Sequence, residues 1–160
     1  MELDLFAKHS NSDFFLRFNA LVYWNSLFKE CPDAKPLFGF SKDYSLDELR
    51  HSKRMLVHSS FIIEMVEKAL KMLGKDDKEL SVFMEDLGRK HIAYKVKPEY
   101  LHIMVESIVR MLKTMLGEHG SFSDEEEAAW QVVLDTLVAN MKKAQREVEM
   151  KKIAETMVTA

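Results

Sequence analysis

Apolar residues recur every three or four positions along most of this chain, in segments separated by few residues that break helices. The 160 residues contain only 3 prolines and 5 glycines, so the sequence offers few of the turns that a β-sheet requires. Methionine is abundant, with 11 residues, and Leu, Glu and Lys, which favour helices, are common. The sequence therefore predicts an all-α fold.

The boundaries of the helices can be predicted from caps and breakers. Pro32 and Pro36 end one apolar segment at a tight corner, and Pro98 stands where another helix begins. Ser45 with Glu48 forms a capping-box pattern, and Ser123 is a second cap. We expect helices over residues 1–10 (short), 14–30, 45–70, 80–91, 98–117, and from about 124 past Met150.

Charge, cysteine content and the absence of familiar motifs exclude several classes of protein. The formal net charge is −3 with mixed signs, which argues against a nucleic-acid binder. Cys31 is the only cysteine, which suits a reducing compartment, and no apolar run or leader signals membrane insertion or export. The chain has no GxSxG, CxxC or HExxH motif. We expect a cytoplasmic protein that has no transmembrane segment and is not an enzyme.

Two histidines carry the strongest chemical signal. His58 and His91 lie 33 residues apart, each in its own amphipathic segment. Imidazoles on facing helices can bind an iron from opposite sides, which would make the chain a haem protein. Each also has an ordinary interpretation, as a half-exposed helix residue for His58 and a surface residue beside Arg89 and Lys90 for His91. His51, in a charged stretch, is a weaker competitor to His58.

Several short motifs follow one another in a characteristic order. Pro32 is followed six residues later by Phe38, and His58 comes twenty residues after Phe38. The later motifs are Leu87-Gly88-Arg89-Lys90-His91, Val96-Lys97-Pro98-Glu99 and Ala128-Ala129-Trp130. Together they resemble the globin family, nearest to invertebrate and nematode intracellular globins and to neuroglobin and cytoglobin. The resemblance is strongest over residues 14–142. It implies a single globin domain over residues 1–160, with six to eight helices around a pocket for haem b.

The resemblance implies a role for each matching residue. His91 corresponds to the proximal iron ligand, His58 to the distal histidine, and Phe38 to the aromatic residue that wedges the haem. The further cofactor contacts that it implies are Ile62 on the distal face, Leu87 on the proximal face, Val96 in the bend after the proximal helix, and Trp24. Propionate partners are sought among Arg89, Lys90, Lys95 and Lys42, which are equally well interpreted as a solvated basic rim.

The role of His58 is open between two alternatives. It can bind the iron itself, giving a bis-histidyl, hexacoordinate haem, or hydrogen-bond an iron-bound ligand. Trp24 is large for a distal position. A tryptophan inside the pocket would restrict dioxygen, whereas a tryptophan turned into the core would not. Neuroglobin and cytoglobin place the distal histidine on the iron, so we favour the bis-histidyl arrangement.

Three functions follow from these alternatives. The first is redox sensing, electron transfer with an unidentified partner, or signalling by a bis-histidyl haem. The second is reversible binding, storage or transport of dioxygen, with CO and NO as further ligands. The third is a haem-free, globin-like domain that binds a partner. The short N-terminal segment and the polar tail to Ala160 lead us to expect that the chain is part of a longer protein.

Overall fold

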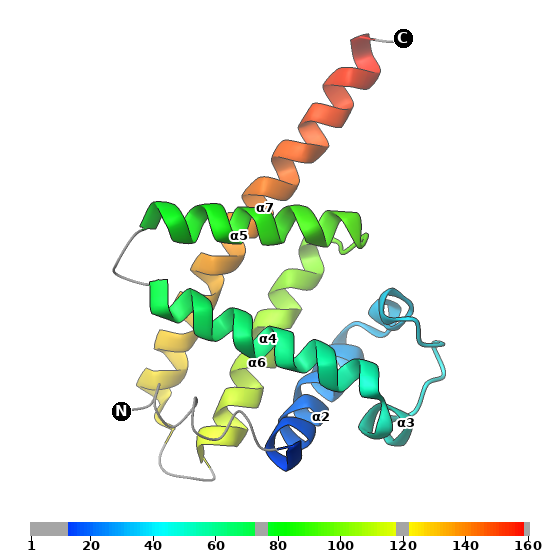
Figure 1. Ribbon diagram of the computed structural model, residues 1–160, viewed down its shortest axis with the longest axis vertical. Coiled ribbons are helices and arrows are strands. Elements are labelled where there is room, and N and C mark those ends of the chain that lie inside the picture. Colours follow the sequence, from blue (N-terminus) through cyan, green and yellow to red (C-terminus); the bar gives the residue numbers. More distant parts are fainter. Residues whose placement is uncertain (1–12, 73–76, 118–121, 159–160) are drawn as a thin grey trace.

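The computed structural model describes residues 13–72, 77–117 and 122–158, and every regular element in these ranges is a helix (Figure 1). The elements are α2 (Asp13–Glu30), the 3-10 helix η1 (Pro32–Phe38), α3 (Leu46–His51), α4 (Lys53–Met72), α5 (Asp77–Ala93), α6 (Pro98–Gly117) and α7 (Asp124–Val158). The predicted all-α fold is confirmed. The short helix expected over residues 1–10 lies outside the described residues.

The caps predicted from the sequence lie where they were expected. The Ser45 hydroxyl accepts the backbone N–H of Glu48 at 3.2 Å, and the Glu48 carboxylate accepts the N–H of Ser45 at 2.7 Å. Ser123 and Glu126 exchange the same pair of bonds at the start of α7. These bonds satisfy amides that the first turn of each helix leaves unpaired, and so they fix where the helices begin.

The single helix expected over residues 45–70 is wrong, because the structure divides it at Ser52. Ser52 adopts an extended backbone (φ −76°, ψ 114°) between α3 and α4. Its hydroxyl accepts the backbone N–H of Met55 at 3.4 Å, as a serine at the start of a helix does. The apolar spacing continues across this break, so periodicity alone did not reveal it.

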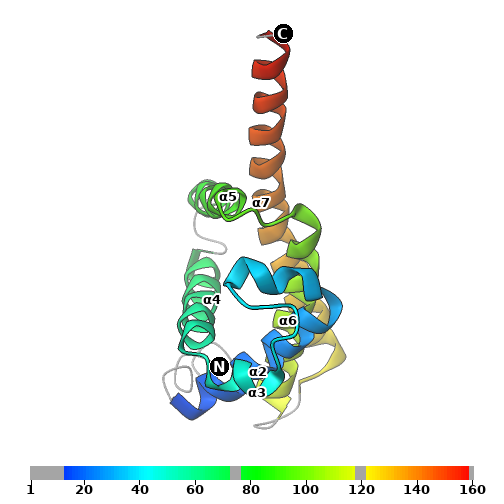
Figure 2. The same cartoon turned by 90° about the vertical axis from the view of Figure 1, so that its right-hand side faces the viewer.

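The helices pack as crossing pairs. Helix α2 packs on α6, and α5 and α6 both pack on α7. Helix α4 stands apart from α6 and α7 in the second view and contacts α2 and α5 (Figure 2). Gly88 lies at the crossing of α5 and α7, where a Cβ atom would come within 2.5 Å of the Met141 carbonyl oxygen. A glycine at this position lets the two backbones approach closely.

The first half of helix α7 packs against the other helices, and its last turns do not. Its first half buries Leu134, Leu137, Val138 and Met141, whereas nearly every residue from 146 to 158 is exposed. The last turns project away from the other helices (Figure 1). The expectation that this helix runs past Met150 with a polar tail is confirmed. None of the described helices is both long and apolar enough to cross a bilayer.

Candidate functional site

A cavity of about 510 Å³ opens between α2, η1, α4, the end of α5 and α6. Apolar side chains make up most of its wall, including Leu27, Leu37, Phe38, Val96, Leu101 and Met104. Its volume lies within the roughly 300–1,000 Å³ that is typical of cofactor and small-molecule sites. His58 and His91 supply imidazoles to this apolar wall.

His91 reaches the cavity from the last turn of α5. Its Nδ1 lies 2.8 Å from the carbonyl oxygen of Leu87, one turn earlier on the same helix. A carbonyl can only accept, so Nδ1 carries the proton and Nε2 keeps a free electron pair. Burial lowers the pKa of His91, and the bond to Leu87 partly opposes that shift. The ring is therefore a neutral imidazole of the kind that binds iron.

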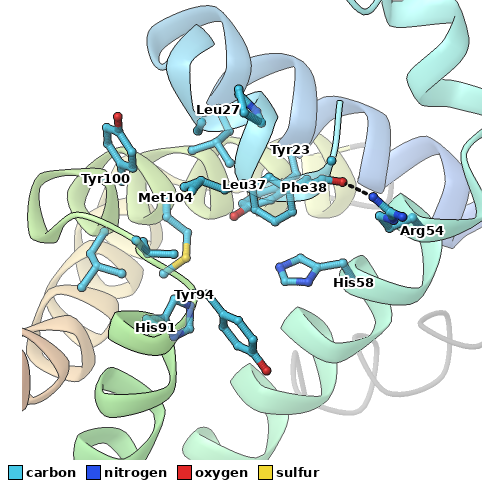
Figure 3. A pocket seen from close by; sticks show the side chains of 15 residues that line it. Tyr23, Leu27, Leu37, Phe38, Arg54, His58, His91, Tyr94, Tyr100 and Met104 are labelled. Atoms are coloured by element: carbon cyan, nitrogen blue, oxygen red, sulfur yellow. Dashed lines mark hydrogen bonds between the residues drawn. The ribbon is translucent and has the colours of Figure 1, made fainter. Parts of the chain in front are cut away.

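His58 reaches the same cavity from α4, as Figure 3 shows. Its ring packs against Phe38 and Trp24, with ring centroids 5.1 and 5.3 Å apart. Burial, followed by the proximity of His91, lowers the pKa of His58 to about 4. Among the described residues, no hydrogen bond engages the His58 ring. The imidazole is therefore neutral at pH 7, and the packing of Phe38 and Trp24 holds the ring in place.

Trp24 lies behind the cavity wall. Its indole N–H donates to the Ser59 hydroxyl at 2.9 Å, and its ring packs edge-on against Phe38 with centroids 4.7 Å apart. Only 1% of the residue is exposed, and it is not among the residues that line the cavity. Trp24 therefore supports His58 and Phe38 from the core. Whether it contacts a bound cofactor stays a prediction.

The other expected cofactor contacts divide into two groups. Phe38 and Val96 line the cavity directly. Ile62 is buried one turn after His58, and Leu87 is half-buried, but neither belongs to the cavity lining. The backbone carbonyl of Leu87 nevertheless orients His91. The roles of Ile62 and Leu87 toward a cofactor stay predictions.

The basic residues considered as propionate partners lie outside the cavity lining. None of Arg89, Lys90, Lys95 and Lys42 lines the cavity. The Lys42 ammonium lies 2.6 Å from Asp33, and the Lys90 ammonium lies 2.8 Å from Asp86. Arg89 approaches Glu85 at 3.9 Å. In this structure the three form surface ion pairs, which agrees with a solvated rim.

Sequence reasoning missed several polar residues of the cavity wall, namely Tyr23, Arg54, Tyr94 and Tyr100. Tyr23 is 2% exposed, and within the described part of the chain its hydroxyl has no hydrogen-bond partner. Burial raises the pKa of Tyr23. Because α2 is apolar around most of its circumference, its sequence does not indicate which side faces a cavity. Arg54 could have been found, because it lies one turn before His58 on the same helix face.

The wall of this cavity fits a haem. The group needs a large apolar space and a neutral imidazole for its iron, and the cavity provides the space and two such imidazoles. Comparison with known proteins adds that residues 22–141 match the family model described as Globin. The chain belongs to the globin family. It is accordingly a haem-binding globin, and the predicted globin fold is confirmed.

Relatives of this globin come from plants and animals. Leghemoglobin 3 of Sesbania rostrata is 27% identical over 129 residues, which cover 79% of this chain and 82% of the relative. Neuroglobin of Tetraodon nigroviridis is 27% identical over 126 residues, which cover 78% and 77% of the two chains. The solved structure of a Drosophila melanogaster globin superposes with a TM-score of 0.71 at 21% identity. That alignment covers 89% of this chain and 92% of the fly protein and demonstrates the shared fold.

Proposed function

We propose that this globin binds haem b with His91 and His58 as its two axial ligands. The observation that carries the proposal is that both imidazoles line one apolar cavity and that both have lowered pKa values. Each ring therefore offers an unprotonated nitrogen at neutral pH. When bound, the haem supplies an iron that changes between ferrous and ferric states by one electron.

The role that fits this ligand pair is redox sensing, electron transfer or signalling with an unidentified redox partner. With both imidazoles as ligands, the iron would stay low-spin in both oxidation states, which would lower the reorganisation that accompanies electron transfer. The hydrogen bond from His91 to the Leu87 carbonyl fixes one ring, while His58 is held by the packing of Phe38 and Trp24. The lone, buried Cys31 agrees with a reducing compartment such as the cytoplasm.

Reversible binding of dioxygen is the second candidate. The ring of His58 has no hydrogen bond among the described residues, so that only packing opposes its movement away from a sixth-site ligand. In this case His91 alone would hold the iron, and His58 would be placed to donate a hydrogen bond to dioxygen. CO and NO compete for the same position.

Visible absorption spectra of the purified protein, oxidised and reduced with dithionite, distinguish these functions. Bis-histidyl ligation predicts sharp, split bands in the reduced form that CO displaces slowly. A broad deoxy band that converts at once to the CO form would favour dioxygen binding. The absence of a Soret band would contradict both candidates and favour a haem-free partner-binding domain.

Two variants sharpen this experiment. In His58→Leu, bis-histidyl ligation predicts loss of the split bands and much faster CO binding. In His102→Leu, the spectrum should not change, because His102 is half exposed and faces Glu106 and Asp135 on the surface. His91→Leu should lose most of its haem under either candidate function.

A further inference from the structure

Arg54 is the only lysine, arginine, aspartate or glutamate among the described residues that line the cavity. It lies in the first turns of α4, one turn before His58, so that both side chains share a helix face. Figure 3 places its guanidinium at the end of the cavity beyond the His58 ring. A single side chain with a permanent charge in a wall of mostly apolar and aromatic residues is a specific chemical feature of this site.

The guanidinium of Arg54 is held by the backbone. Its Nη1 donates to the carbonyl oxygen of Phe38 at 2.6 Å. Within the described ranges, no carboxylate lies at ion-pair distance from it, in contrast to Lys42 and Lys90. Arginine has five N–H donors in a planar fork, and the Phe38 carbonyl accepts from only one nitrogen, Nη1. The remaining donors can donate to a planar anion such as a carboxylate, whose two oxygens match the shape of the fork.

Gly39 provides the space in which this guanidinium lies. Its backbone is left-handed, with φ +76°, and a Cβ atom there would come within 2.1 Å of Nη1 of Arg54. Any other residue would displace the guanidinium from the Phe38 carbonyl. The turn that ends η1 and the start of α4 therefore build the position of Arg54 together.

We propose that Arg54, fixed by the Phe38 carbonyl in the space left by Gly39, binds a carboxylate of the cofactor that occupies the cavity. This inference rests on the proposed binding of haem b, which carries propionate carboxylates. Arg54 was not among the residues that the sequence suggested for this role, of which Lys42, Arg89 and Lys90 form ion pairs at the surface. The carboxylate neutralises the positive charge of Arg54, and the guanidinium keeps its hydrogen bond to the Phe38 carbonyl.

The test measures the rate of haem dissociation from the holoprotein to an excess of an acceptor protein. Wild type and Arg54→Met are each loaded with haem or with its dimethyl ester, which has no carboxylate. We expect Arg54→Met to release haem roughly three- to five-fold faster, the scale of an exposed ion pair, and to release the ester at the wild-type rate. Arg54→Lys, which keeps the charge, should lie between wild type and Arg54→Met.

Lys53→Met is the matched control. It removes one positive charge from the adjacent, exposed position of α4, which does not line the cavity. It should leave both dissociation rates unchanged. If Arg54→Met accelerates the loss of haem and ester equally, Arg54 acts only through Phe38 and the carboxylate site is refuted. An unchanged haem rate refutes it as well.

Failure of this site is distinguishable from failure of the proposed function. The absorption spectrum shows how many histidines bind the iron. The carboxylate contact is shown by the difference between the dissociation rates of haem and of its dimethyl ester. A protein with only His91 on the iron would still show the Arg54 difference. A bis-histidyl spectrum with no Arg54 difference would remove this inference alone.

Discussion

The indole of Trp24 and the hydroxyl of Ser59 form a buried hydrogen bond of 2.9 Å directly behind His58. Ser59 in turn donates to the carbonyl of Met55 at 2.8 Å. Trp24 on α2 is thereby connected to the backbone of α4, the helix that carries His58. This bond gives the indole N–H an acceptor inside the core. Trp24 therefore does not line the cavity, whereas His58 and His91 do.

Ser59→Ala should remove the partner of a buried indole. The unfolding free energy should fall by about 1–3 kcal/mol, because the Trp24 N–H would remain desolvated without an acceptor. Urea denaturation measures the change. Ser60→Ala is the control, because the Ser60 hydroxyl donates only to the Leu56 carbonyl of its own helix. If both variants lost the same unfolding free energy, the Trp24–Ser59 hydrogen bond would contribute nothing beyond the loss of an ordinary serine hydroxyl.

The stability of the haem-free protein should depend on pH through His58. The pKa of His58 is lowered to about 4 in the folded chain, against about 6.5 when unfolded. Between these values the unfolded chain binds more protons, so stability rises with pH from about 4 to 6.5 and is fully present above that range. The contribution of a shift of this size is on the order of 3 kcal/mol.

Urea denaturation at a series of pH values measures this dependence. His58→Leu should flatten the slope between pH 4 and 6.5, leaving the smaller contribution of His91, whose pKa is also lowered. His51→Leu is the control, because His51 is exposed and lies outside the cavity. An identical slope in wild type and His58→Leu would show that His58 is solvated.

Gly88→Ala should separate α5 from α7. The added Cβ would lie 2.5 Å from the Met141 carbonyl oxygen, and neither backbone can move without disturbing the core. We expect a loss of roughly 1–3 kcal/mol of stability, as for other overpacked sites. The Soret band should weaken as well, since His91 follows three residues later. Gly117→Ala is the control, because a Cβ there meets nothing within 4 Å.

Removal of residues 149–160 should leave the cavity and the fold intact. The described residues of this segment are exposed and project away from the other helices. The unfolding free energy should change by less than about 1 kcal/mol, because little buried surface is lost. Thermal unfolding and the haem spectrum check this expectation. A large loss of stability would mean that the tail is packed in solution.

Local chemistry in the sequence was sufficient to predict most helix boundaries. Pro98 begins α6, Ser45 and Glu48 cap α3, and Ser123 caps α7, because each acts through atoms within a few residues along the chain. The bond from His91 to Leu87 was predictable for the same reason, since residues four apart lie one turn apart. The break at Ser52 was not predictable from apolar spacing, which is the same on both sides of it.

By itself, the sequence determined the all-α class, the ends of most helices and the two histidines that matter, because these depend on periodicity, caps and residue type. Only the tertiary structure decided that His58 and His91 share one cavity and that Trp24 lies behind it. The tertiary structure also decided that the cavity is lined by the cation of Arg54 and not by that of Lys42 or Lys90. These facts depend on how helices distant in sequence cross, and crossing is set by packing between helices rather than by any one segment.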